Sequence, residues 1–584
     1  MAAEVLGKCL LAMLIMAVLS SATRLSAGTV DSVYFAPYDS RDELQMDVAL
    51  AVTVTEACLA NKTLRSPGEE NPYQILWAVY NLLDMDYIQP LIDAFNAGVE
   101  VKVLIEFTQL SQPYVPLYEI FKNNSLRVAP TCYDTNRNLS LTNLQNLNLV
   151  GIDVQEKTTF SNGTGIMHTK TRYFRWNDNT GVKNECVASG SMNTEDTALL
   201  NDETLLITSD PESIRQYLQF FWSTLYNNDT ALNVFIPTQT SNLLYSLYAG
   251  NKSTAALSVV LDWLQNEEEL IIFSVYCLLD LYGPVFGENP LTGLALVDVL
   301  CDRKKAGVKV MVMTDKDCCD GDGSFNSGDD TVTAYQIAQC DIPVYKCKNW
   351  GCPDPTQCYT AFHHKNVVFG TPKAKAGTKI TTGTANWSGS SMGGGVGKKA
   401  YTPVNAETQV FLANETVTWT RFLSNSLYSI RKYESQQACP YLGPNNTVVT
   451  DQCAGSPRNP FNQPNWTQPA YSSIFEDFSQ LVSWPTVNVT FAVEGLASSD
   501  TVYVFMVASN SKLYLSFDAN TQAWLGELPD LKIGSILSYA IYVNNTLASP
   551  TTQLIVDPAY DWTANVRLPD ANIVVGFITE IIQF

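Results

Sequence analysis

One small arrangement of residues occurs twice in this chain, and the repeat constrains both fold and chemistry. Histidine occurs only three times in 584 residues. The first copy places His168 two residues before Lys170, and the second places His363 and His364 directly before Lys365. Residues i and i+2 of a strand share a face, so each His and Lys of an HxK motif can point at one ligand. Because histidine exchanges protons near neutral pH, we expect the two segments to act together.

A small-residue turn ending in asparagine follows each motif, at residues 190–193 and 383–386. Phosphoryl transfer through a histidine requires such a pair of segments. One imidazole attacks phosphorus, and the other protonates the leaving alcohol and then activates water. We therefore predict His168 and His363 as catalytic residues. The groups expected to bind the substrate and neutralise its non-bridging oxygens are Lys170, Lys365, Asn193, Asn386, Ser191 and Thr384.

Two other interpretations of the motifs remain open. An HxK sequence can occur by chance, although two copies with matching turns make this a poor explanation. A zinc site could use His168, His363 and His364, but adjacent residues of a strand point in opposite directions. The cysteines also lack paired C-x2-C spacing. We predict no metal site and no cofactor.

The repeat extends beyond the motifs. Residues 97–104 (AGVEVKVL) recur as 306–313 (AGVKVMVM), and each copy follows a helical pattern, at 88–95 and 294–305. A helix that ends at glycine before an apolar strand indicates an α/β layout in both halves. Strands are also predicted at the motifs themselves, over residues 171–174 and 367–369.

The two segments resemble the phospholipase D superfamily, whose signature is HxKxxxxD followed by GSxN, twice per active site. The resemblance covers residues 31 to 435 or so and implies two tandem α/β halves forming one catalytic unit. It also implies that Glu203 and Glu407, shortly after each Asn, orient the motif histidines. Arg175 and Gly370 stand where the family has the Asp of each motif, and Asp178 could replace the first.

The N-terminus predicts export. Lys8 precedes an apolar run from Cys9 to Leu19, with small residues to Ala27, as in a secretory signal peptide; an uncleaved signal anchor is the alternative. About a dozen Asn-x-Ser/Thr sequons agree with a secreted or lysosomal protein. We expect the sequon at Asn386 to be buried and unmodified.

Cysteine usage fits an oxidising compartment. Fourteen cysteines include one in the predicted signal peptide, so one mature cysteine is expected to be free or intermolecular. A cluster before the second motif predicts disulfides beside the site, and it comprises Cys318, Cys319, Cys340, Cys347, Cys352 and Cys358. Cys439 and Cys453 are predicted to close a second loop.

The net charge of −22 argues against long-range steering of nucleic acid. Residues 356–405 differ, because they contain lysines but no Asp or Glu. Such a segment suits an anionic substrate or is simply a solvated loop. Gly393 to Gly395 within it predict a mobile flap.

The C-terminal region has another character. Residues 440–470 are rich in Pro, Asn and Gln, and short alternating runs follow at 487–493, 501–507, 513–517, 538–543 and 552–556. These runs predict a small all-β sandwich. Three aromatic residues of this region either pack in its core or form a glycan- or lipid-binding face: Trp484, Tyr503 and Trp524. The predicted domains are a signal peptide (1–27), two α/β halves (28–228 and 229–436), a linker (437–470) and the sandwich (471–584).

The resemblance leaves several functions open. A phospholipid head-group ester is the first substrate considered. The 5′ end of single-stranded DNA or RNA is the second, since the export signal, sequons and acidity resemble the family's lysosomal exonuclease branch. Another exported phosphodiester is the third. A secreted binding protein with a decayed cleft is the non-enzymatic alternative. No stable protein partner is implied.

Overall fold

The computed structural model describes a set of ranges that contains both motifs. With short gaps inside some of them, these are residues 30–61, 71–106, 149–152, 166–222, 243–248, 255–282, 295–315, 333–347, 361–434, 441–442, 448–449, 486–555, 564–568 and 571–576. The predicted signal peptide, Cys318, Cys319, Cys352, Cys358, Cys439, Cys453 and Trp484 lie outside the described residues.

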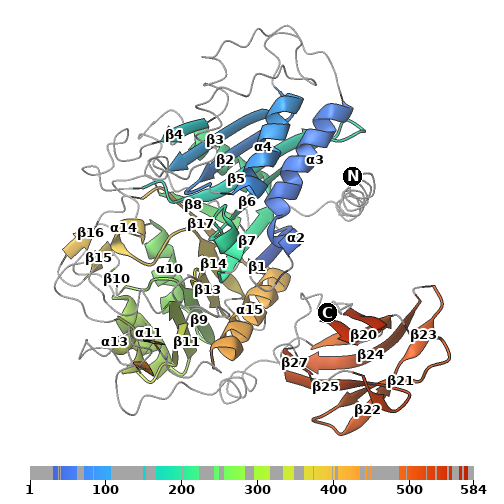
Figure 1. Cartoon of the computed structure of the whole chain (residues 1–584). Coiled ribbons are helices and arrows are strands. Elements are labelled where there is room, and N and C mark those ends of the chain that lie inside the picture. Colours follow the sequence, from blue (N-terminus) through green and yellow to red (C-terminus); the bar gives the residue numbers. More distant parts are fainter. Residues whose placement is uncertain are drawn as a thin grey trace. The chain divides into compact units, whose positions relative to one another are not determined.

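The first half is built on a seven-stranded sheet (Figure 1) of order β1-β7-β6-β5-β2-β3-β4. Its strands are β1 (Ser32–Ala36), β2 (Gln74–Val79), β3 (Glu100–Glu106), β4 (Leu149–Ile152), β5 (Lys170–Asn177), β6 (Lys183–Gly190) and β7 (Glu203–Thr208). Helices α3 (Met46–Ala60) and α4 (Met85–Ala97) contribute to one apolar core with this sheet. Asp84 caps the start of α4, and Gly98 ends it with φ of 103°.

The second half contains another seven-stranded sheet, of order β12-β11-β9-β13-β14-β17-β8. Its strands are β8 (Leu243–Tyr248), β9 (Leu270–Val275), β11 (Lys309–Asp315), β12 (Val344–Cys347), β13 (Lys365–Phe369), β14 (Lys379–Gly383) and β17 (Glu407–Ala413). Helices α10 (Ala255–Gln265) and α11 (Leu296–Lys305) share its core. Gly307, with φ of 94°, follows α11.

The two sheets have the same topology. In each, three strands run parallel and four antiparallel pairings follow: β4-β3-β2-β5-β6-β7-β1 corresponds to β12-β11-β9-β13-β14-β17-β8. The predicted α/β architecture is confirmed. The sequence repeat at 97–104 and 306–313 becomes β3 and β11, each preceded by the predicted helix.

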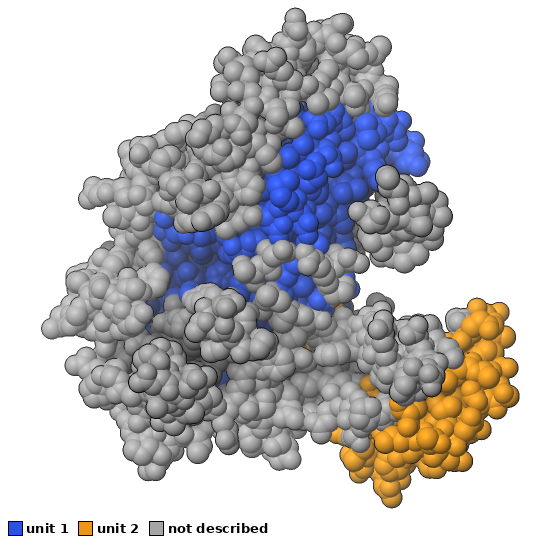
Figure 2. All heavy atoms as spheres, in the orientation of Figure 1, with its two compact units in different colours: residues 1–418, 438–466 blue, residues 419–437, 467–584 orange. Residues whose placement is uncertain are grey.

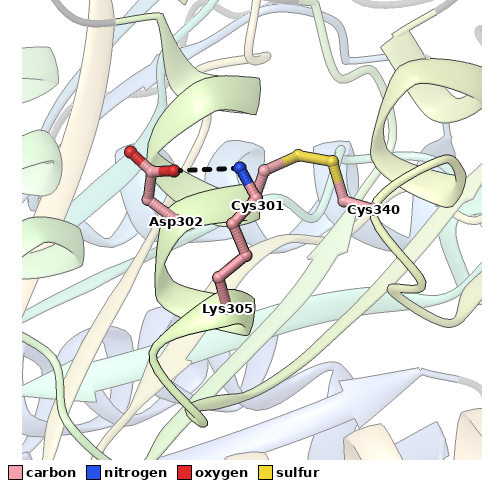
Figure 3. Close-up of a disulfide and its surroundings, with 4 residues drawn as sticks. All are labelled: Cys301, Asp302, Lys305 and Cys340. Atoms are coloured by element: carbon pink, nitrogen blue, oxygen red, sulfur yellow. Dashed lines mark hydrogen bonds and ion pairs between the residues drawn. A yellow bond between two sulfur atoms is a disulfide. The ribbon is translucent and has the colours of Figure 1, made fainter.

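A disulfide staples the helical layer of the second half (Figure 3). Cys301 of α11 is bonded to Cys340, which follows α13 (Thr333–Ala338). Cys340 belongs to the predicted cysteine cluster, but its partner lies outside that cluster. Packing of α11 beside α13 decided this pairing, which spacing alone did not reveal. Among the described cysteines, Cys186 is free, and it is buried.

The C-terminal sandwich has two sheets around one core (Figure 1). One contains β20 (Thr486–Glu494), β23 (Ser516–Asp518), β24 (Ala523–Lys532), β28 (Ala564–Leu568) and β29 (Ala571–Gly576). The other contains β21 (Val502–Met506), β22 (Ser511–Tyr514), β25 (Ile536–Val543), β26 (Thr546–Leu547) and β27 (Thr552–Ile555). The predicted β domain is confirmed, and Trp524 packs in its core. Strand β24 was missed because Gly526 and Pro529 interrupt its pattern.

The described chain divides into two compact units (Figure 2), residues 1–418 with 438–466 and residues 419–437 with 467–584. The remaining elements are α2 (Arg41–Leu44), η2 (Asp196–Leu199), α9 (Pro211–Gln219), β10 (Leu281–Tyr282), α14 (Gly389–Met392), β15 (Gly394–Val396), β16 (Lys399–Tyr401), α15 (Thr416–Glu434), β18 (Tyr441–Leu442) and β19 (Val448–Val449). Residues 394–395, predicted as part of a flap, lie in the three-stranded sheet β10-β15-β16. Among the described helices, none has the length and apolarity needed to span a bilayer.

Candidate active site

Both histidine motifs stand at the start of a central strand, β5 or β13, and each is tied to the opposite half by backbone hydrogen bonds. The amide of His168 donates to the carbonyl of Ala406 at 2.8 Å, and the amide of His363 donates to that of Asp202 at 2.9 Å. Each acceptor immediately precedes one of the two predicted glutamates. These backbone hydrogen bonds therefore place each histidine beside the glutamate of the other half.

The histidine–glutamate pairs cross between the halves. His168 Nδ1 lies 2.9 Å from Glu407 Oε2, and His363 Nδ1 lies 2.7 Å from Glu203 Oε1. Each hydrogen bond holds the ring by Nδ1 and leaves Nε2 as the nitrogen available to a substrate. Both glutamates contact a motif histidine, as the family resemblance implied. The exchange of partners was not visible in the sequence.

The middle residue of each motif points away from this pair. Thr169 Oγ1 lies 2.6 Å from Thr408 Oγ1, and His364 Nδ1 lies 2.9 Å from Thr204 Oγ1. Each threonine partner directly follows a site glutamate. These matched contacts place His364 in the framework between the halves.

The two motif lysines are buried and make the same contact. Lys170 Nζ donates to the carbonyl of His168 at 2.9 Å, and Lys365 Nζ donates to that of His363 at 2.7 Å. Burial lowers the pKa of Lys170 to about 8 and that of Lys365 well below its ordinary value. An anionic substrate would favour the charged form of both.

Two tyrosines that the motif analysis missed accompany these groups. Tyr80 follows β2, and its ring centre lies 5.1 Å from that of His168; Tyr276 follows β9 and lies 5.1 Å from His363. The nearer lysine stands over each ring, at 5.2 and 5.3 Å. Their signal in the sequence was positional, since each is the first residue after corresponding strands.

The asparagine turns supply further polar groups. Ser191 Oγ donates to Glu203 and Thr384 Oγ1 donates to Glu407, each at 2.6 Å. Within the described structure, the buried Oδ1 atoms of Asn193 and Asn386 have no hydrogen-bond partner. Because an amide oxygen is an acceptor, these two atoms can accept a hydrogen bond from a ligand that donates one.

The site is electrostatically unequal on its two sides. Burial raises the pKa of Glu203 to about 7. Burial also opposes ionisation of Glu407, but the charge of His168 and hydrogen bonds to the carboxylate outweigh it and lower the pKa to about 2. Burial lowers the pKa of His168, against the attraction of Glu407. Burial, with Lys365 and Lys170, lowers the pKa of His363 well below its ordinary value.

The departures from the family signature have local explanations. Arg175 uses its guanidinium to donate to the carbonyl of Asn71. Gly370 has φ of 69°, and a side chain there would collide with the carbonyl oxygen of Gly377. Asp178 does not take over the first position, since it lies in the exposed turn after β5 and accepts from the amide of Thr180 at 2.9 Å. Turn formation explains its presence.

Among the described residues, no group of three or more His, Cys, Asp and Glu side chains is arranged to hold a metal ion.

Residues 70–225 match the family described as "Cardiolipin synthase, PLD-like domain". No curated protein matches the chain. Among solved structures, polyphosphate kinase from Porphyromonas gingivalis is 15% identical over 68% of this chain and 46% of its own, with a TM-score of 0.38. The chain thus spans under half of that protein.

Two smaller structures are also similar. Nuc from Salmonella typhimurium, a phospholipase D family member, is 16% identical over 33% of this chain and 94% of its own, with a TM-score of 0.22. NucT from Helicobacter pylori is 15% identical over 33% and 92%, with a TM-score of 0.21. The family match lies in the first half, and the paired HxK and Asn motifs of both halves resemble those of the phospholipase D superfamily.

Proposed function

We propose that this protein hydrolyses phosphodiesters through a covalent phosphohistidine and that its substrate is the head-group ester of a phospholipid. The crossed pairing of His168 with Glu407 and His363 with Glu203 carries the proposal. Each imidazole is held at Nδ1 by a carboxylate, so both Nε2 atoms are left to react with the substrate. A pair of this kind provides a nucleophile and a general acid–base group.

The remaining motif groups would stabilise the transferring phosphoryl group. Lys170 and Lys365 lie beside their histidines, and the hydrogen-bond donors of the motifs are the ammonium groups of these lysines and the side-chain N–H groups of Asn193 and Asn386. Preorganised donors of this type neutralise charge that develops on the equatorial oxygens. They supply the positive field that a metal ion provides in other phosphodiesterases.

Net charge and the N-terminal region bear on the substrate and the compartment. The net charge of −22 disfavours a polyanion approaching from a distance, which favours a phospholipid over single-stranded nucleic acid. The apolar N-terminal run and the sequons support a secreted or lysosomal enzyme. A binding protein with a decayed cleft would not need to retain every motif His, Lys and Asn.

Purified protein should be incubated with phosphatidylcholine vesicles, with 5′-hydroxyl single-stranded oligonucleotides and with bis(p-nitrophenyl) phosphate. We expect choline release and nitrophenol release, with steady-state turnover of both substrates abolished in His168→Ala and His363→Ala. Stepwise shortening of the oligonucleotide without choline release would identify a 5′ exonuclease. No hydrolysis of any of the three by folded protein would favour the binding protein.

A further inference from the structure

The two site glutamates do not receive equal support. Glu407 accepts from His168 Nδ1 and from three other side chains. Thr384 Oγ1 donates at 2.6 Å, Ser391 Oγ at 2.8 Å and Asn405 Nδ2 at 3.2 Å. All of these side chains except His168 belong to the second half.

Glu203 has a sparser environment. Apart from His363, one side chain among the described residues donates to it, Ser191 at 2.6 Å. Ser391 lies eight positions after the first glycine of its turn, and the same count in the first half reaches Ala198, which has no hydroxyl. The duplicated halves therefore differ at a position that decides how many donors the glutamate has.

This difference bears on which imidazole holds a proton. Hydrogen bonds to a carboxylate favour its ionised form, and an ionised carboxylate stabilises a neighbouring imidazolium. The pKa values agree, since Glu407 is lowered to about 2 whereas burial raises Glu203 to about 7. Burial lowers the pKa of both histidines; Glu407 opposes this at His168, whereas the pKa of His363 lies well below its ordinary value.

Other charged groups around the rings do not reverse the asymmetry. Lys170 and Lys365 each lower the pKa of both histidines. The corresponding strands β3 and β11 end in the acidic residues Glu106 and Asp315. Their carboxylates accept hydrogen bonds from the backbone amides of Met167 and Phe362, at 2.6 and 2.8 Å. Tyr80 and Tyr276 are also matched in the two halves. Two charges occur in the first half alone, Arg172 and Glu195, and they shift the pKa of Lys170 in opposite directions. The glutamate environment is the difference that contacts the rings directly.

We infer that His168 is the general acid–base residue and His363 the nucleophile, with Ser391 and Asn405 as positioning residues that keep Glu407 ionised. The inference rests on the proposed phosphodiesterase function and assigns the roles within it.

With these roles, hydrolysis proceeds in two steps. His363 Nε2 attacks phosphorus, the bond to the leaving oxygen breaks, and that oxygen takes the proton from His168 Nε2. A water molecule then loses a proton to His168 as its oxygen attacks phosphorus, and the bond to His363 breaks. The products are a phosphomonoester and an alcohol, and both histidines return to their starting states.

Trapping the covalent intermediate tests the assignment. Bis(p-nitrophenyl) phosphate is suitable because its leaving group departs without a proton. His168→Ala should give a stoichiometric burst of nitrophenol, stop, and carry the phosphoryl label on His363 after alkaline quenching and peptide mass spectrometry. His363→Ala should give neither burst nor label. Circular dichroism establishes that both variants are folded.

The outcomes separate the inference from the function on which it rests. A burst in His363→Ala with the label on His168 overturns the assignment but keeps the phosphohistidine mechanism. Turnover by the wild type with no label on either histidine, in any variant, overturns the proposed mechanism and the assignment together.

A pH profile tests the positioning residues separately. Ser391→Ala removes a donor from Glu407, so the imidazolium of His168 is less stable. On a phosphodiester with an alkyl leaving group, which needs the proton, the alkaline limb of kcat/KM should therefore move down by about one pH unit. Ser191→Ala is the matched control, since it removes a donor from Glu203 and should move the acid limb. If Ser391→Ala moves the acid limb or neither limb, the positioning role is wrong.

Discussion

The two α/β halves share a backbone plan but stabilise it with different side chains. Both sheets have the same strand order, and both motifs make the same backbone bonds across the halves. Four residues after the motif histidine, however, the first half has Arg172, paired with Asp47 of α3 at 3.0 Å, whereas the second has the apolar Val367. In the second half, a disulfide joins Cys301 of α11 to Cys340, which follows α13. The comparison shows that the two halves share the backbone frame around the motifs and differ in the packing behind it.

The largest effect is expected at the motif histidines. His168→Ala and His363→Ala should each lower kcat by at least about 10²–10⁴-fold on a natural ester, because each removes one partner of an acid–base pair. His364→Ala and its counterpart Thr169→Val should cost far less, since both side chains bond to framework threonines. Steady-state kinetics on all four variants makes the comparison. Loss of activity in His364→Ala with an active His363→Ala would show that the register is wrong.

The crossed pairing predicts which substitutions resemble one another. Glu407→Gln and Glu203→Gln should each reduce kcat by roughly 10–100-fold, the value of a hydrogen bond to a charged group. Glu407→Gln should add little to His168→Ala, and Glu203→Gln little to His363→Ala, when kcat is measured in the double variants. Non-additivity within a half, between His168 and Glu203, would contradict the exchange of partners.

The buried ion pair behind the first motif provides a stability test. Arg172→Ala should lower the free energy of unfolding by about 3–5 kcal/mol, because it leaves the carboxylate of Asp47 buried without its partner. The double variant Asp47→Leu with Arg172→Met should be nearly neutral, making the first half resemble the apolar second half. Urea unfolding measures both. Equal losses in the two variants would mean that packing, not charge, is decisive.

The pH dependence follows from burial. Burial lowers the pKa of both histidines, so the protonated acid is lost as pH rises through a value below the ordinary pKa of about 6.5. Activity should therefore follow a bell with its optimum at roughly pH 5–6.5. Measuring kcat/KM on a soluble phosphodiester with an alkyl leaving group tests this, because that leaving oxygen needs the proton of the acid. A continuous rise through about pH 9 excludes the histidine pair, whereas a bell above about pH 8 removes only the argument for an acidic compartment.

The smallest effect is expected from metal removal. If lysines and asparagines of both halves supply the positive field, exhaustive EDTA treatment should leave kcat unchanged. Inactive protein that recovers only with zinc or magnesium would contradict the proposed mechanism. A zinc-treated sample without EDTA serves as the control.

The sequence by itself determined the elements of this fold. Apolar strands, glycine-terminated helices and two HxK motifs are local patterns, and local patterns report which residues share a strand or end a helix. They therefore predicted β3, β5, β11 and β13, the duplication and the residues of the candidate site. They missed β24, where Gly526 and Pro529 break the pattern but cross-strand pairing with β20 holds the strand.

Only the tertiary structure decided how the two halves are connected. That His168 meets Glu407 rather than Glu203 depends on backbone bonds between segments more than two hundred residues apart in sequence. The pairing of Cys301 with Cys340, the tyrosines beside the histidines and the extra donors to Glu407 depend on such contacts as well. Sequence spacing carries no information about long-range proximity, because the loops between these segments can close in many ways at similar entropic cost.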